Sequence, residues 1–249
     1  MAGGGGAAPP LLLALETATR VMSVALLDGD RVVAEISSDD ARVHSERLLP
    51  AIDRLLDLAG TRLDAVGAFA ISIGPGSFTG LRIGLATLKA LAFDETRPLA
   101  AVPTLAALCA AAAGAPGPVA ALLDARRGEM YAAAVASAGD AEPTLLRDSV
   151  FTPEELAAVL PPETTLVIGE DAEPAAARLR LLRPDLRALP PAACAARAGR
   201  VGRLARMLLA DGRALPAAEL VPRYVRRAEA EVRRTGEPLE PVPERRSLR

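Results

Sequence analysis

The sequence contains few of the side chains on which proteins that read nucleic acids depend. Tryptophan is absent, aromatic residues make up only 2% of the 249 residues, and the formal net charge is −2. A protein that grips a nucleic-acid backbone generally has a basic excess, and one that binds unpaired bases needs rings on which they stack. The composition therefore predicts that this chain is not the main reader of an RNA or DNA.

Histidine and cysteine are scarce too, which limits metal and nucleophilic chemistry. His44 is the only histidine, and Cys109 and Cys194 lie far apart and outside any C-x-x-C pair. A zinc site needs several such ligands, and a nucleophile of the Ser-His or Cys-His type needs a neighbouring histidine. The sequence excludes zinc ribbons and dithiol redox motifs. It favours a surface or capping role for His44 and buried apolar positions for both cysteines.

Long hydrophobic runs are missing as well. The first apolar run, residues 11–15, ends at Glu16, and no other run reaches about 18 apolar residues without a charge. The N-terminus has no basic region of the kind that begins a signal peptide. We therefore expect a cytoplasmic protein without membrane segments, whose residues 1–10 form a disordered leader.

Hydrophobic residues make up 51% of the chain, enough for a sizeable core. Short apolar or alternating runs predict strands, and runs with helical spacing predict helices. The predicted strands are 11–16, 21–27, 31–37, 66–73, 99–102, 119–124, 129–135 and 165–169. The predicted helices are 43–59, 79–93, 104–113, one from 152, and 192–210.

This order describes a mixed sheet with helices on its faces that occurs about twice. It predicts an α/β fold of the two-lobed actin-like, Hsp70 or sugar-kinase (ribonuclease H-like) type. A Pro/Gly break at 115–118 divides the chain into a lobe at 11–114 and a lobe at 115–224. Residues 225–249 are rich in Pro, Arg and Glu, and we expect a poorly ordered tail.

A glycine-rich loop lies between a predicted strand and a predicted helix at residues 74–80. Its glycines and the free N–H groups of the helix start could hold an anion through Gly76, Ser77 and Thr79. Two acids, Glu16 and Asp124, end equivalent strands of the two lobes, as a phosphotransferase of this architecture would require. The alternative is structural: the loop is a tight turn, and each acid is a turn residue or a cap.

The helix at 79–93 is apolar on more than one side, and the helix at 43–59 has one wide apolar face. One explanation is burial between the sheet and the neighbouring helix, and the other is an exposed apolar surface for a partner protein. The candidate interface residues are Leu48, Leu49, Ile52, Leu56, Phe78, Leu81, Leu85 and Leu88.

Five segments, in order along the chain, together resemble the TsaB (YeaZ) family. They are residues 12–19 (LLALETAT), 44–50 (HSERLLP), 74–84 (GPGSFTGLRIG), 124–131 (DARRGEMY) and 222–227 (PRYVRR). The third is the most specific, and the set covers residues 11–227. The resemblance implies a non-catalytic subunit, with no cofactor of its own, that binds the catalytic subunit TsaD through the first two helices of the N-terminal lobe. TsaE, an ATPase, joins them.

The implied product is N6-threonylcarbamoyladenosine beside the anticodon of ANN-reading tRNAs, with tRNA reached through the complex. The chain alone could pair with a second copy. In the catalytic relative two histidines, four residues apart, bind a metal, and Thr104 and Leu108 stand at those positions here. Neither can supply a metal site, so the resemblance implies a relative that has lost its active centre. Glu16 replaces the aspartate of many members, which weakens any claim of nucleotide chemistry.

Three alternatives stay open from the residues. The chain could be a small kinase or ATPase that uses Glu16, Asp124 and the glycine-rich loop, or a metallopeptidase, which a single histidine disfavours. Direct tRNA contact by the C-terminal arginines is the third, against a solvated, frayed end. These arginines are Arg223, Arg226, Arg227, Arg233 and Arg234.

Overall fold

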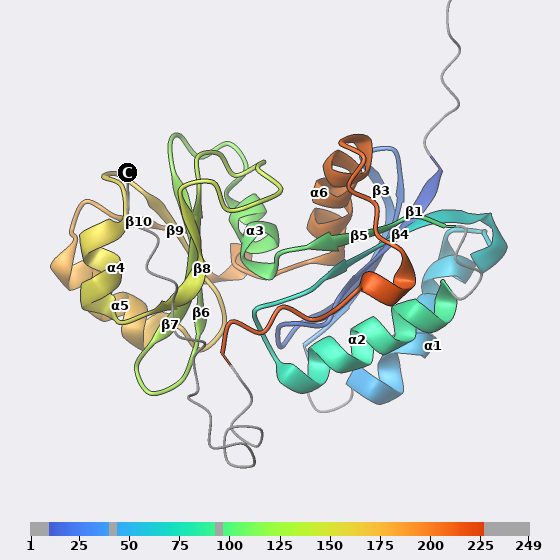
Figure 1. Ribbon diagram of the computed structural model, residues 1–249, viewed down its shortest axis with the longest axis horizontal. Coiled ribbons are helices and arrows are strands. Elements are labelled where there is room, and N and C mark those ends of the chain that lie inside the picture. The colour runs from blue at the N-terminus through green and yellow to red at the C-terminus, as the bar shows by residue number, and fades with distance from the viewer. Residues whose placement is uncertain (1–9, 40–43, 93–96, 227–249) are drawn as a thin grey trace, which may run out of the picture.

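The computed structural model describes residues 10–39, 44–92 and 97–226. Residues 1–9 of the expected leader and residues 227–249 of the expected tail lie outside this described part. The chain forms two five-stranded sheets side by side, with helices on their faces (Figure 1). The predicted α/β fold of the two-lobed actin-like type is confirmed.

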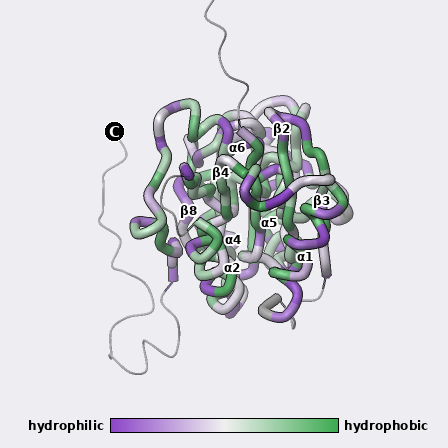
Figure 2. Tube along the Cα trace, turned by 90° about the vertical axis from the view of Figure 1, so that its right-hand side faces the viewer, coloured by the Kyte–Doolittle hydropathy of each residue, from purple (hydrophilic) through white to green (hydrophobic). Residues whose placement is uncertain are grey.

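The first sheet has the strand order β3-β2-β1-β4-β5. Its first three strands are antiparallel neighbours along the chain, and the last two run parallel to β1. Hydrophobic stretches, green in Figure 2, include β2, whose side chains are buried from Met22 to Leu27. The strands are β1 (Leu11–Glu16), β2 (Met22–Asp28), β3 (Arg31–Ser38), β4 (Val66–Ser72) and β5 (Leu99–Val102).

Alternating side chains of β1 serve two hydrophobic cores, because successive residues of a strand point to opposite faces. Leu13 and Leu15 pack in the core under α1 (His44–Leu58) and α2 (Phe78–Leu91). Leu12 and Ala14 pack in the core under α6 (Ala198–Ala210). The first sheet is therefore covered on both faces.

The second sheet repeats this topology, with the order β10-β9-β6-β7-β8. The strands are β6 (Val119–Asp124), β7 (Met130–Val135), β8 (Leu146–Phe151), β9 (Thr165–Ile168) and β10 (Arg187–Ala188). Its helices are α3 (Thr104–Cys109), α4 (Pro153–Val159) and α5 (Glu173–Leu182). Single-turn 3-10 helices lie at Leu63–Ala65, Ala110–Ala112, Pro191–Ala193 and Ala217–Glu219.

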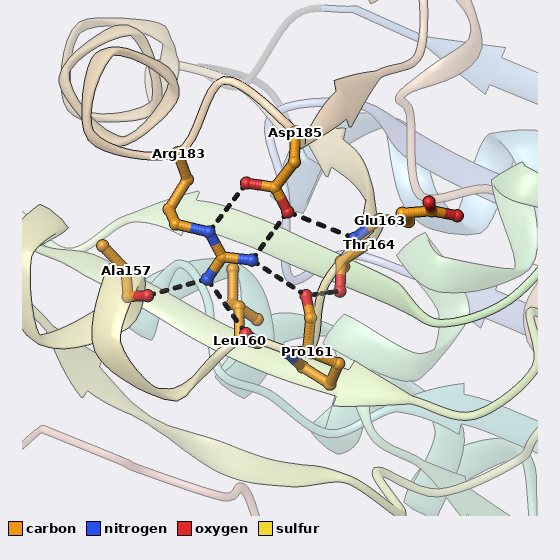
Figure 3. Close-up of polar contacts among 7 residues, drawn as sticks. All are labelled: Ala157, Leu160, Pro161, Glu163, Thr164, Arg183 and Asp185. Carbon is orange, nitrogen blue, oxygen red and sulfur yellow. Dashed lines mark hydrogen bonds and ion pairs between the residues drawn. The ribbon is translucent and has the colours of Figure 1, made fainter.

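Arg183 joins the ends of α4 and α5 (Figure 3). Its guanidinium donates to the carbonyl oxygens of Ala157, 2.8 Å, and Leu160, 3.0 Å, and pairs with Asp185 at 2.8 Å. The hydrogen bonds from Arg183, and a weaker contribution from the backbone N–H of Glu163, hold the pKa of Asp185 well below its usual range. Because the carbonyls and the carboxylate satisfy the charge locally, this cluster stabilises the second sheet and offers no free binding group.

The helix α6 follows the second sheet in the chain but packs on the first. Val201, Leu204 and Leu208 lie in the same core as Leu12 of β1. The division into lobes at residue 115 stays a prediction, and by packing α6 belongs with the first sheet. Within the described residues, no helix has both the length and the apolar character that a membrane span requires.

Candidate functional site

Glu16 ends β1 with a fully buried carboxylate. Its Oε1 accepts hydrogen bonds from the backbone N–H groups of Ala18, 2.7 Å, and Thr19, 3.0 Å. Burial raises the pKa of Glu16 to about 7, although Ser72 and the two N–H groups lower it in part. The side chain therefore closes the turn after β1. It is not exposed to a substrate, as a catalytic acid would have to be.

Three glycines bring α2 against this turn. A Cβ atom on Gly76 would lie 2.2 Å from the Ala18 carbonyl oxygen, and one on Gly80 would lie 2.1 Å from the Thr17 carbonyl oxygen. A Cβ atom on Gly84 would lie 2.1 Å from Oγ1 of Thr17. The spacing of four residues puts Gly80 and Gly84 on one face of α2, with Gly76 in the loop before it. Only glycine permits this close approach.

The donors at the start of α2 are partly used by the protein itself. The N–H of Ser77 donates to the Ala18 carbonyl at 2.6 Å. The Ser77 hydroxyl caps the helix by accepting from the N–H of Gly80 at 3.2 Å. Thr79 is exposed in the first turn. These contacts support the interpretation of the loop as a tight structural turn, since an anion at the helix start would need the same donors.

Asp124 at the end of β6 is likewise engaged in a turn. Its Oδ1 accepts from the backbone N–H of Arg126 at 3.0 Å, and its carboxylate pairs with the Arg126 guanidinium at 3.4 Å. Arg126 and Arg127 have positive φ angles of 68° and 57°, so the carboxylate helps to hold a strained reversal. Asp124 therefore fits the structural alternative of a turn residue.

A pocket of about 470 Å³ lies between the second sheet and residues that flank strands of the first, Arg20, Val21 and Asp39, but neither Glu16 nor Asp124 lines it. It contains Arg20 on one side and Glu170 on the other. The backbone N–H of Arg20 donates to Oε2 of Glu170 at 2.6 Å, and the Arg20 guanidinium pairs with Asp39 at 2.9 Å. The structure does not bring the two strand-end acids together in this pocket.

The two positions at which the resemblance expects metal ligands face the protein interior. Thr104 is fully buried, and its hydroxyl accepts from the N–H of Gly74 at 3.0 Å. Its own N–H donates to the Gly74 carbonyl at 3.0 Å. Leu108 is 1% exposed and packs in the core beneath the second sheet. Among the described residues, no group of three or more His, Cys, Asp or Glu side chains could hold a metal ion.

Most of the residues proposed for a partner interface lie in the protein's own core. Leu49 is the exposed member, at 51%, and Phe78 is half-buried. The remaining six hold the helices on the first sheet, so they cannot touch a partner directly. These six are Leu48, Ile52, Leu56, Leu81, Leu85 and Leu88.

Besides Leu49, the exposed residues of α1 and α2 include several that were not among the predicted interface residues. Leu58 is 63% exposed, and Pro50, Ala86 and Ala90 are exposed too. A charged substitution at Leu56 or Leu85 would therefore disturb the core, and it could not test partner binding in a folded chain.

The segment at 222–226 joins the two sheets, which sequence reasoning missed. The backbone N–H of Arg223 donates to the Ile73 carbonyl at 2.7 Å. The Arg223 guanidinium pairs at 2.7 Å with Asp148 of β8, whose side chain is fully buried. Arg226 pairs with Glu129 and donates to a carbonyl of the β6–β7 turn. Only the position of this segment in the family resemblance hinted at such a role.

Tyr224 completes this contact on α2. Its ring stacks on Phe78 with centroids 5.1 Å apart, and its hydroxyl accepts from Nε of Arg82 at 3.3 Å. The Arg82 guanidinium lies 3.9 Å from the centroid of the Phe78 ring. The expectation of a poorly packed chain after Tyr224 is thus wrong for Arg226, while Arg227, Arg233 and Arg234 lie outside the described residues.

Comparisons with known proteins agree with the resemblance. Residues 31–178 match the family model described as TsaD: tRNA N6-adenosine threonylcarbamoyltransferase. The tRNA threonylcarbamoyladenosine biosynthesis protein TsaB of Escherichia coli (strain K12) is 37% identical over 154 residues, 61% of this chain and 63% of that protein. The protein of the same name from Bacillus subtilis (strain 168) is 35% identical over 120 residues, 48% of this chain and 52% of that protein.

These alignments span about half to two thirds of each curated relative. Over its whole length, a solved structure described as YeaZ from Pseudomonas aeruginosa is similar to this chain. The TM-score is 0.73 at 32% identity, with 87% of this chain and 100% of that chain covered. This similarity and the family-model match over more than half of the chain show that the protein belongs to the TsaB/YeaZ family, within the broader TsaD group.

Proposed function

We propose that this chain is a non-catalytic subunit that binds a TsaD-type transferase and supports its N6-threonylcarbamoylation of tRNA. The target is the adenosine next to the anticodon of ANN-reading tRNAs, and a TsaE-type ATPase is the third component. The proposal depends most on Thr104 and Leu108. Where the resemblance expects metal-binding histidines, one side chain bonds Gly74 and the other fills a hydrophobic core.

The rest of the site supports a chain without chemistry of its own. Glu16 is buried, Asp124 is engaged with Arg126, and the pocket between the sheets contains neither. A phosphotransferase needs an acid and anion donors that reach a bound substrate. The complex, and not this chain, would supply ATP and metal, and it would act in the cytoplasm.

The outward face of α1 and α2 is our proposed surface for the TsaD-type partner. It presents Leu49 on α1 and the small exposed residues Ala86 and Ala90 on α2. Small side chains let a second pair of helices approach closely, and docking would remove the apolar surface of Leu49 from water. In the absence of the partner, the same face could pair two copies of this chain.

Reconstitution tests the proposed function. The purified chain, a TsaD-type subunit and a TsaE-type ATPase from the same organism would be mixed with tRNA transcript, ATP and the threonylcarbamoyl donor, and modified adenosine would be measured. We expect modification only when this chain and the TsaD-type subunit are both present, and no ATP turnover by this chain alone. ATP turnover that is lost in Glu16→Ala would instead support the small-ATPase alternative.

The interface has a matched pair of variants. Leu49→Arg places a charge on the outward face of α1, and Leu181→Arg places the same charge on α5, where the leucine is 84% exposed. Both chains should remain folded because both leucines already face water. We expect Leu49→Arg to weaken binding of the TsaD-type subunit at least tenfold and Leu181→Arg to leave it unchanged. Equal binding by both variants would contradict the proposed surface.

A further inference from the structure

The helix α6 bears a row of positive charges. Arg197 precedes its first residue, and Arg200, Arg203 and Arg206 follow at intervals of three, with no acidic residue between 197 and 210. Arg197 and Arg203 are exposed, and the other two are half-buried. In a chain with a net charge of −2, such a cluster is a local feature and not a reflection of overall composition.

No carboxylate among the described residues pairs with any of these four arginines. Arg213, just beyond the helix, does form an ion pair, with Glu142. The guanidiniums of α6 are held instead by neutral oxygen atoms. Nε of Arg203 donates to the Asp30 carbonyl at 3.2 Å, and Nε of Arg206 donates to the Gly29 carbonyl at 3.2 Å. The hairpin thus orients Arg203 and Arg206, whereas Arg197 donates to the Ser37 hydroxyl at 3.1 Å and Arg200 to the Ala193 carbonyl at 3.4 Å. None of these contacts is an ion pair.

This arrangement has an electrostatic cost. Like charges three residues apart on a helix repel each other, and a cation near a helix N-terminus opposes the helix dipole. Burial and then the charge of Arg197 lower the pKa of the Arg200 guanidinium. Backbone carbonyls hold Arg200 and Arg206, but among the described residues no ion pair offsets this repulsion, and an anionic ligand would.

Nearby acidic residues neutralise the positive charge of these four arginines only in part. Asp28 pairs with Arg31, and Glu35 accepts hydrogen bonds from Ser23 and from the backbone N–H of Gly199. Asp30 is the remaining acid of the hairpin. Its backbone carbonyl, and not its carboxylate, holds Arg203.

We propose that Arg197, Arg200, Arg203 and Arg206 form a binding face for an RNA phosphate backbone. Arg203 uses only Nε within the described chain, so its two terminal nitrogens are available as a paired donor for a phosphate. The row extends about 13 Å along the helix, long enough for more than one phosphate. The choice of RNA over another polyanion rests on the proposed function.

The face on α6 replaces the C-terminal arginines as the point of RNA contact in the described chain. Arg223 and Arg226 are held in ion pairs with Asp148 and Glu129. An RNA would have to break these pairs, one of which involves a fully buried carboxylate, before it could use either arginine. For the arginines of α6 an RNA would have no ion pair within the described chain to break.

Fluorescence anisotropy of a labelled tRNA transcript, titrated with the full chain at 50 to 200 mM salt, tests this proposal. Arg203→Glu is compared with Arg187→Glu, which changes net charge equally at an exposed arginine of the second sheet. We expect Arg203→Glu to weaken RNA binding about tenfold and to flatten its salt dependence, with little effect of Arg187→Glu. Arg203→Lys should retain most of the affinity, and Arg197→Glu should weaken it as Arg203→Glu does.

Three results would overturn the proposal: no RNA binding by the unchanged chain at 50 mM salt, an equal loss in Arg187→Glu, or binding to phosphatidylserine vesicles but not to RNA. Circular dichroism and thermal melting would verify that each variant is folded. Because the assay uses this chain alone, it is independent of binding to a TsaD-type subunit. Selective loss in Arg203→Glu would stand even if reconstitution failed.

Discussion

Replacing Glu16 with glutamine should remove a pH-dependent loss of stability. Burial raises the pKa of Glu16 from 4.5 to about 7 in the folded protein. Between these values the folded state binds the proton more tightly than the unfolded state does, so the free energy of unfolding falls as pH rises. At about 1.4 kcal/mol for each pH unit, the loss from pH 4.5 to above pH 7 amounts to about 3 kcal/mol.

Glutamine stays neutral, so the variant should lack this loss. Its amide oxygen can still accept from the N–H groups of Ala18 and Thr19, and its NH2 group can face Ser72. Urea unfolding of both chains at pH 5, 6, 7 and 8 measures the difference. We expect similar stability at pH 5 and an advantage for Glu16→Gln of about 3 kcal/mol at pH 8.

The same substitution at an exposed acid, Glu219→Gln, serves as the control and should shift the difference between pH 5 and pH 8 by less than about 0.5 kcal/mol. Parallel pH profiles for Glu16→Gln and the unchanged chain would refute the reasoning. A glutamine variant that is less stable at pH 8 would show that the buried carboxylate is ionised and well satisfied.

Further predictions concern packing, an ion pair and a thiol. In Gly84→Ala the added Cβ would lie 2.1 Å from Oγ1 of Thr17, so urea unfolding should show a free energy of unfolding lower by about 1–3 kcal/mol. The control Gly139→Ala has no atom within 4 Å of the added Cβ and should be as stable as the unchanged chain. Equal losses of stability in both variants would contradict the packing role of Gly84. Arg223→Ala leaves the carboxylate of Asp148 buried without its partner. Because the Arg223 side chain is 42% exposed, we expect the free energy of unfolding to fall by only about 2 kcal/mol, and adding Asp148→Asn should restore part of it. Strictly additive losses in a double-mutant cycle would contradict the ion pair. Burial raises the pKa of Cys109 to about 12, so its alkylation at pH 8 should follow global unfolding in urea, and fast labelling of the folded chain would contradict this.

The sequence predicted those parts of the fold that depend on local pattern. Apolar runs located the strands of the first sheet and most strands of the second. The strand β8 was not predicted because Arg147 and Asp148 interrupt the apolar pattern of its segment, LRDSVF. Asp148 is buried because Arg223, far away in the chain, pairs with it, and no local pattern contains that information.

The candidate site was predictable only as a pair of alternatives. The loop glycines Gly76 and Gly80 are compatible with an anion cradle and with close packing, and the backbone carbonyls of Ala18 and Thr17 decide for packing. Similarly, the apolar face predicted for α1 is wide, so periodicity could not separate buried Leu48 from exposed Leu49. That distinction depends on how the two helices lie on the sheet.

Light scattering of the chain mixed with a TsaD-type subunit from the same organism tests the central claim most directly. The chain has a mass of 25.7 kDa. We predict that the mixture elutes as one species whose mass equals the sum of one copy of each subunit, and that Leu49→Arg separates it into its components. Two unassociated species at micromolar concentration, with the unchanged chain alone turning over ATP, would contradict the account and return attention to Glu16 and Asp124.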